Sequence, residues 1–179
     1  MMTGKASDQT DRKPLVSLVD GDVLTVRGDV LICPANPWLN MSGGVNGEIL
    51  QRGGEPVQRE LHSYLEKSGQ KSVAPLTVVV TEPGELPFRR IVHAVAIDPF
   101  YDTSAEVVEA TLRAALREGR LIGRKIVMPA LATGYGRLPL AEFARAFWSA
   151  TSELTSSDLE IVLVLRTSSL IEEFRGYSV

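Results

Sequence analysis

The chain has 179 residues, a length that fits one domain with a full hydrophobic core. Hydrophobic residues make up 44% of it and charged residues 23%, and the formal net charge of -3 excludes the basic surface on which non-specific nucleic-acid binding depends. One cysteine, Cys33, excludes an internal disulfide, and with only two histidines the chain offers no metal-ligand cluster. No apolar run is long enough to cross a membrane and no apolar signal core follows Met1, so we expect a cytoplasmic protein.

Periodicity predicts alternating strands and helices along the chain. Residues 1–13 are polar and aperiodic, which predicts a disordered tail before a single domain over residues 14–179. Apolar, β-branched runs predict strands at 15–19, 30–33, 76–81, 90–97, 126–128 and 159–165. Apolar residues at helical spacing predict helices at 45–51, from 55 to Gly69, from a capping box at 103–106 to Gly119, at 140–154 and at 168–174.

Strands that alternate with amphipathic helices predict a mostly parallel sheet covered on both faces. In open sheets of this kind, ligands bind at the carboxyl ends of the strands. Three suspicious segments follow predicted strands: Asp22, residues 36–44 and residues 132–136. Their convergence on one edge predicts a binding site. Cys33 and His93 lie inside apolar strands, so we interpret both as core residues.

The segment from Pro34 to Gly44 combines two prolines, an asparagine and a glycine pair. Pro34 and Pro37 lack a backbone donor and are expected to end the strand, which places Asn36 at its exit. Gly43 and Gly44 precede a helical pattern, so unpaired N–H groups and the helix dipole favour an anion such as phosphate there. A flexible strand-to-helix loop is the alternative that the same residues allow.

Residues 132–136 repeat this arrangement: a strand exit rich in glycine, followed by a helix. It is not a Walker loop, because no Gly-Lys-Ser/Thr follows, and it lacks the third glycine of a dinucleotide fingerprint. Two nests of N–H donors on neighbouring strand ends could hold the two phosphates of a pyrophosphate. Two tight turns selected for packing would leave the same pattern.

Two polar side chains could either bind a ligand or stabilise their own turn or loop. Asp22 suits an amino group such as that of adenine, or it bonds the backbone of its own turn. Asn36 offers a donor and an acceptor to ribose hydroxyls, or it stabilises its own loop.

Several motifs together resemble the macrodomain family. They are Gly21-Asp22-Val23, Pro34-Ala35-Asn36-x-x-Leu39, Gly43-Gly44-Val45, Val92-His93-Ala94-Val95 and Pro129-Ala130-Leu131-x-Thr133-Gly134-x-Gly136, in matching order between Leu15 and Phe174. The resemblance implies an α/β fold, a three-layer α/β/α sandwich with a mixed, mostly parallel central sheet. It also implies ADP-ribose, free or on an ADP-ribosylated protein, as the partner. Apart from the resemblance, we expect a monomer without cofactor or metal.

The resemblance also implies a role for each site residue. Asp22 would hold the adenine amino group, and Leu165 would pack on the adenine face. Asn36 would bond the distal ribose, and Tyr135 would wall its site unless it is a surface tyrosine. Val23 would lie beside Asp22 at the adenine. The phosphate loops and their neighbours would be formed by Ala35, Ser42, Gly43, Gly44, Val45, Ala132, Thr133, Gly134 and Gly136.

The departures from the family pattern concern catalysis. Cys33 replaces the first asparagine of Asn-Ala-Ala-Asn, Ser42 replaces the first of three glycines, and the second phosphate loop is one residue shorter. Asn46 stands where hydrolases resembling the MacroD type carry an aspartate. An amide is no general base at neutral pH, although it can orient water. We expect an (ADP-ribosyl)hydrolase with Asn36 and Asn46 as its catalytic residues; the alternative is a non-catalytic reader or sensor of ADP-ribose.

Overall fold

The computed structural model describes residues 13–155 and 158–177. The strands are β1 (Leu15–Asp20), β2 (Val30–Ala35), β3 (Val78–Thr81), β4 (Arg90–Val95), β5 (Lys125–Pro129) and β6 (Glu160–Leu165). The helices are the 3₁₀ turn η1 (Val23–Thr25), α1 (Gly44–Gly53), α2 (Glu55–Ser68), α3 (Ala105–Ile122), α4 (Leu140–Ser152) and α5 (Ser168–Arg175). The expected tail, residues 1–13, lies outside the described residues except for Lys13. Among the described helices, none has both the length and the apolar run that a membrane span requires.

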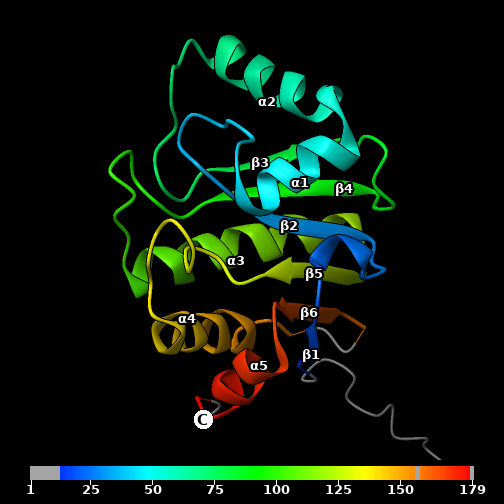
Figure 1. Ribbon diagram of the computed structural model, residues 1–179, viewed down its shortest axis with the longest axis vertical. Helices are drawn as coiled ribbons and strands as arrows, with labels where there is room; N and C mark the ends of the chain where they lie inside the picture. The colour runs from blue at the N-terminus through cyan, green and yellow to red at the C-terminus, as the bar shows by residue number, and fades with distance from the viewer. Residues whose placement is uncertain (1–12, 156–157, 178–179) are drawn as a thin grey trace, which may run out of the picture.

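The strands form one sheet in the order β1-β6-β5-β2-β4-β3 (Figure 1). Neighbouring strands are parallel except β3 and β4, which pair antiparallel with Val79 opposite His93. The mixed, mostly parallel sheet is therefore confirmed. Because β1, β6, β5, β2 and β4 run in the same direction, their carboxyl ends lie at one edge.

Alternate residues of each strand enter different cores, as the two-residue period of a strand requires. In β2, Val30 and Ile32 pack in the core beneath α3, α4 and α5, whereas Leu31 and Cys33 pack in the core beneath α1 and α2. Figure 1 shows α1 and α2 near β3 at the top, α3 behind the strands, and α4 and α5 near β6 and β1 at the bottom. The sheet is thus the middle layer of an α/β/α sandwich, as expected.

The prediction that Pro34 ends its strand is wrong. β2 continues to Ala35, with Pro34 opposite Ala94 and Ala35 opposite Val95 of β4. On the other side of β2, the ladder with β5 covers only Val30 and Leu31. A proline is tolerated here because only alternate residues of a parallel strand bond to a given neighbour.

The predicted start of α3 is also wrong by one residue. The N-cap is Ser104, whose hydroxyl accepts the N–H of Val107 at 3.3 Å. Thr103 instead donates its hydroxyl to the carbonyl of Ala96 at 2.5 Å. The capping box at 103–106 therefore identified the helix but assigned its cap to a side chain that bonds instead to Ala96, the residue after β4.

Gly119 does not end α3 as predicted. The helix continues to Ile122, and Gly119 is buried within it. A Cβ at Gly119 would lie 2.9 Å from Cδ1 of Ile126, so the glycine lets α3 approach β5 closely. Packing, not helix termination, explains this residue.

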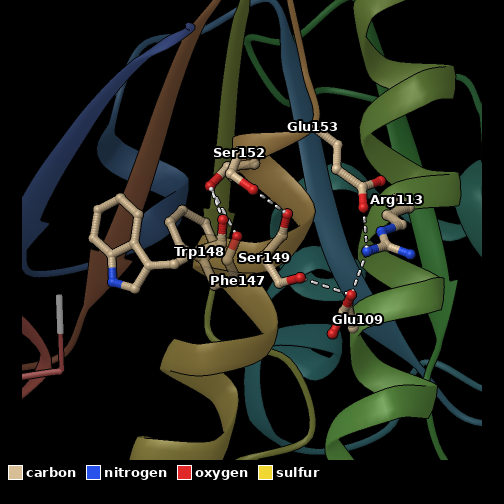
Figure 2. Close-up of polar contacts among 8 residues, drawn as sticks. Glu109, Arg113, Phe147, Trp148, Ser149, Ser152 and Glu153 are labelled. Carbon is tan, nitrogen blue, oxygen red and sulfur yellow. Dashed lines mark hydrogen bonds and ion pairs between the residues drawn. The ribbon is translucent and has the colours of Figure 1, made fainter. Parts of the chain in front are cut away.

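A polar cluster joins α3 to α4 on their outer side (Figure 2). Arg113 pairs with Glu109 of its own helix and with Glu153, which follows α4, at 2.5 Å. Ser149 donates its hydroxyl to the same Glu109 carboxylate at 2.8 Å. These contacts tie the two helices together on one side of the sheet.

Candidate functional site

The strand exits surround one cavity of about 1250 Å³. It lies at the carboxyl ends of β1, β2, β4, β5 and β6, where open α/β sheets place their ligands. Every residue that was given a ligand or catalytic role lines it, including both glycine loops, which the chain separates by nearly 90 residues. The cavity therefore collects these residues, while their roles toward a ligand stay predictions.

The first glycine loop leaves the start of α1 open toward the cavity. Gly43 and Gly44 have φ angles of 67° and 52°, which favour glycine. No side chain caps α1, whose first-turn residues Gly44, Val45 and Asn46 all line the cavity. The N–H groups of a first helical turn have no partner within the helix, so they can bind an anion.

The second glycine loop is shaped by its own backbone. Ala132 has a φ of 60°, and its carbonyl accepts the N–H of Leu138 at 3.0 Å. A Cβ at Gly136 would lie 2.7 Å from that carbonyl, so packing requires this glycine. A Cβ at Gly134 would meet nothing within 4 Å, so the protein itself does not require glycine there.

Tyr135 brings the two loops together. A Cβ at Gly43 would lie 2.6 Å from the Tyr135 hydroxyl oxygen, so this ring reaches across to the first loop. The Tyr135 side chain is nevertheless 68% exposed. It thus forms an outer wall of the cavity. This placement agrees in part with Tyr135 as a wall of the site and in part with Tyr135 as a surface tyrosine.

Asp22 uses both carboxylate oxygens within the protein. Oδ1 accepts the N–H of Leu24 at 2.9 Å and caps η1, as the structural reading of this residue expected. Oδ2 pairs with the Arg52 guanidinium of α1 at 2.6 Å. Asp22 also lines the cavity, and each oxygen keeps a further lone pair for a ligand donor.

Asn36 stabilises its own loop. Its Oδ1 accepts the N–H groups of Trp38 and Asn40, each at 3.1 Å, and its Nδ2 donates to the Asn40 carbonyl at 2.8 Å. An amide nitrogen carries two hydrogens, so one remains for a ligand in the cavity. Both readings of Asn36 are therefore compatible with its geometry.

The side-chain oxygen of Asn46, unlike that of Asn36, accepts no hydrogen bond in the described part of the chain. Its Oδ1 is buried and has no hydrogen-bond partner in the described part of the chain, although Asn46 lines the cavity. A buried acceptor without a partner is costly unless a ligand or water donates to it. Asn46 thus has an unpartnered acceptor that is closed to solvent, whereas the Asn36 amide keeps one donor hydrogen without a partner in the described residues.

Comparison with known proteins agrees with this architecture. The family model described as "Macro domain" matches residues 32–147. The chain belongs to the macro domain family. The match includes Asn36, Asn46 and both glycine loops, whereas Asp22 and Leu165 lie outside it.

Relatives of this macro domain come from archaea and bacteria. An uncharacterized protein of Pyrobaculum aerophilum is 31% identical over 139 residues, which are 78% of this chain and 75% of that protein. A macro domain-containing protein of Streptomyces nogalater is 31% identical over 134 residues, 73% of each chain.

Solved structures share the fold of this macro domain at low identity. The Oceanobacillus iheyensis macrodomain with ADP has a TM-score of 0.80 at 22% identity and covers 89% of this chain and 87% of that one. The Trypanosoma brucei macrodomain in complex with ADP-ribose has a TM-score of 0.73 at 21% identity, over 96% and 70% of the two chains.

The sequence reasoning missed cavity residues that follow β4 and β6. Tyr101 lines the cavity and packs near Tyr135 and Trp38, with ring centroids 6.0 and 6.3 Å away. Arg166 lines it directly after β6. The signal was available, because the same rule of strand exits applies to residues 96–101; it was not used there because that loop lacks glycine. Glu48 of α1 was also missed.

Cys33 and His93 lie inside this macro domain and away from the cavity lining, as expected for core residues. Burial raises the pKa of the Cys33 thiol and lowers the pKa of His93 to about 3. His93 lies between Cys33 Sγ at 3.3 Å and Thr81 Oγ1 at 2.9 Å, and Thr81 donates to the Glu82 carbonyl. Neutral His93 therefore donates from Nε2 to Thr81 and accepts the thiol proton at Nδ1.

Within residues 13–155 and 158–177, no group of three or more His, Cys, Asp and Glu side chains could hold a metal ion.

Proposed function

We propose that this macro domain binds ADP-ribose along the cavity. The observation that carries the proposal is the meeting of two N–H-rich glycine loops in one cavity, with Asp22 and Leu165 from the ends of β1 and β6 and the amides of Asn36 and Asn46 from other segments. A diphosphate is the anion that two neighbouring donor loops suit best. The relatives solved with ADP and ADP-ribose support the same ligand.

Calorimetry tests this binding. Saturable heat with ADP-ribose is expected, and adenosine without phosphates should bind far more weakly because it cannot use the N–H groups of Gly44 and Val45. Absence of saturable heat with ADP-ribose would reject the proposal.

We further propose that the bound ADP-ribose is released from modified proteins or from ADP-ribosyl esters. A water between Asn36 and Asn46 would attack the anomeric carbon of the distal ribose as its bond to the protein oxygen breaks. Since neither amide removes a proton, a phosphate oxygen of the ligand would accept it, and orientation would supply most of the rate. The unpartnered Asn46 Oδ1 supports the step, because a rotation of this side chain toward the cavity would let it accept from the water.

A reader without turnover is the second candidate. It is favoured by Asn46, an amide at the position where hydrolases resembling the MacroD type carry an aspartate. Incubation with a mono-ADP-ribosylated protein separates the two candidates: release of ADP-ribose above a buffer control supports the hydrolase, and its absence despite binding supports the reader. The variant Asn46→Asp adds a control. Activity that appears only in this variant would identify the natural protein as a reader.

A further inference from the structure

Helix α1 begins at the first glycine loop and reaches Asp22 through Arg52 in its last turn. Gly44, Glu48 and Arg52 lie at intervals of four residues, so they share one face of the helix. Gly44 and Glu48 line the cavity. Arg52 lies two helical turns, about 12 Å, after Gly44 on the same helix face and pairs with Asp22.

Arg52 pairs across the fold with a residue 30 positions away. Its Nη2 lies 2.6 Å from Oδ2 of Asp22, although Glu48, one helical turn earlier, is at the usual position for an ion pair within a helix. The guanidinium is thus directed at the carboxylate beside the cavity.

Two contacts restrain the Asp22 carboxylate. The N–H of Leu24 holds Oδ1 at 2.9 Å, and Arg52 holds Oδ2. The terminal torsion of an aspartate is otherwise broad, so these two partners set the plane in which the free lone pairs lie. Arg52 also offsets the cost of removing water from this carboxylate when a ligand covers it.

We infer that Arg52 is a positioning residue that holds Asp22 ready to accept the amino group of adenine. This inference rests on the proposed function, since it requires a purine beside Asp22. The Asp22 and Arg52 side chains are 31% and 44% exposed, and exposed ion pairs contribute little to folding. The consequences of the pair are therefore expected in ligand affinity and not in stability.

A double-mutant cycle tests the inference with ADP-ribose as the probe in calorimetry. Arg52→Ala should weaken binding about fivefold, as expected for the loss of one charge-assisted contact. In an Asp22→Ala background the same substitution should have no effect, because Arg52 acts through that carboxylate. Arg52→Lys should restore part of the affinity. The matched control is Arg120→Ala, which removes an arginine from the last turn of α3 and should change nothing.

Two further readouts exclude a general structural role. The thermal midpoint of ligand-free Arg52→Ala should equal that of the wild type. Its preference for ADP-ribose over inosine diphosphate ribose, which carries a carbonyl in place of the amino group, should fall. Equal losses for both ligands, or a loss that persists without Asp22, would overturn the inference. Wild-type binding with no effect of Arg52→Ala would reject the inference alone, whereas no binding by the wild type would reject the proposed function.

Discussion

Asn36 is bonded to its loop before any ligand arrives. Its amide holds the backbone of Trp38 and Asn40, and the same side chain faces the cavity. Loop stability and ligand contact are therefore combined in one residue. Any loss of activity in an Asn36 variant therefore has to be compared with that variant's loss of folding stability.

The first prediction concerns this residue. Asn36→Ala removes the acceptor of two backbone N–H groups, so the free energy of unfolding should fall by about 1–3 kcal/mol. Urea unfolding measures the change. The control is Asn40→Ala, which loses only an exposed contact with His62 and should stay within about 0.5 kcal/mol of the wild type. An unchanged stability of Asn36→Ala would show that the loop does not depend on its amide.

The second prediction contrasts two glycines of one loop. Gly134→Val should fold normally, because a Cβ there meets nothing within 4 Å, yet it should weaken ADP-ribose binding at least about tenfold because the new side chain enters the cavity. Gly136→Val should instead lower stability, since its Cβ would lie 2.7 Å from the Ala132 carbonyl. Circular dichroism and calorimetry measure the two effects. Normal binding by Gly134→Val would remove the second loop from the ligand site.

At the scale of elements, the helices differ in how they begin. Ser104 and Thr167 cap α3 and α5 through their hydroxyls. At the cavity, α1 begins at a glycine pair without a side-chain cap. A side chain that capped α1 would compete with an anion for the same N–H groups, so an uncapped start suits a helix that binds one.

The third prediction follows from the cap of α3. Ser104→Ala should lower the free energy of unfolding by about 1 kcal/mol, because the N–H of Val107 loses its acceptor. Chemical denaturation provides the measurement. As a comparison, Ser152→Ala removes an exposed hydroxyl at the end of α4 and should have little effect. Equal values for the two variants would contradict the assignment of Ser104 as the cap.

At the scale of the whole molecule, one sheet separates two apolar cores. Both cores pack against the same strands, so we propose that residues 14–179 form a single domain. His93 lies within β4 at 1% exposure and is neutral there. Its protonation would place a charge between Cys33 and Thr81 without a counterion.

The fourth prediction is the pH dependence that this burial causes. The native pKa of His93 is about 3, whereas an unfolded histidine has a pKa of about 6.5. The unfolded state therefore binds more protons between these values, so stability should fall by about 1.4 kcal/mol per pH unit below pH 6.5 and be constant above it. Urea unfolding between about pH 4.5 and 6.5 measures the slope, which His93→Gln should reduce. If that variant does not fold, the ring resonances of wild-type His93 should still show a neutral imidazole at about pH 5. A protonated ring at that pH would contradict the prediction.

Much of the fold could be predicted from local chemistry. Continuous apolar runs identified β2 and β6, and helical spacing identified α2 and α4. The strand-exit rule selected Asp22, Asn36 and the glycine loops, and the structure gathers all of them at one cavity. The exit of β4, with Tyr101, was missed because no glycine marked it.

What the sequence by itself determined were the elements, their alternation and the edge of the sheet that carries the cavity, because periodicity and backbone donors are properties of neighbouring residues. Only the tertiary structure decided that Tyr135 reaches Gly43 and that Arg52 holds Asp22. These features depend on distances between segments far apart in the chain. Such distances exist only after both cores have packed against the sheet, so no local pattern records them.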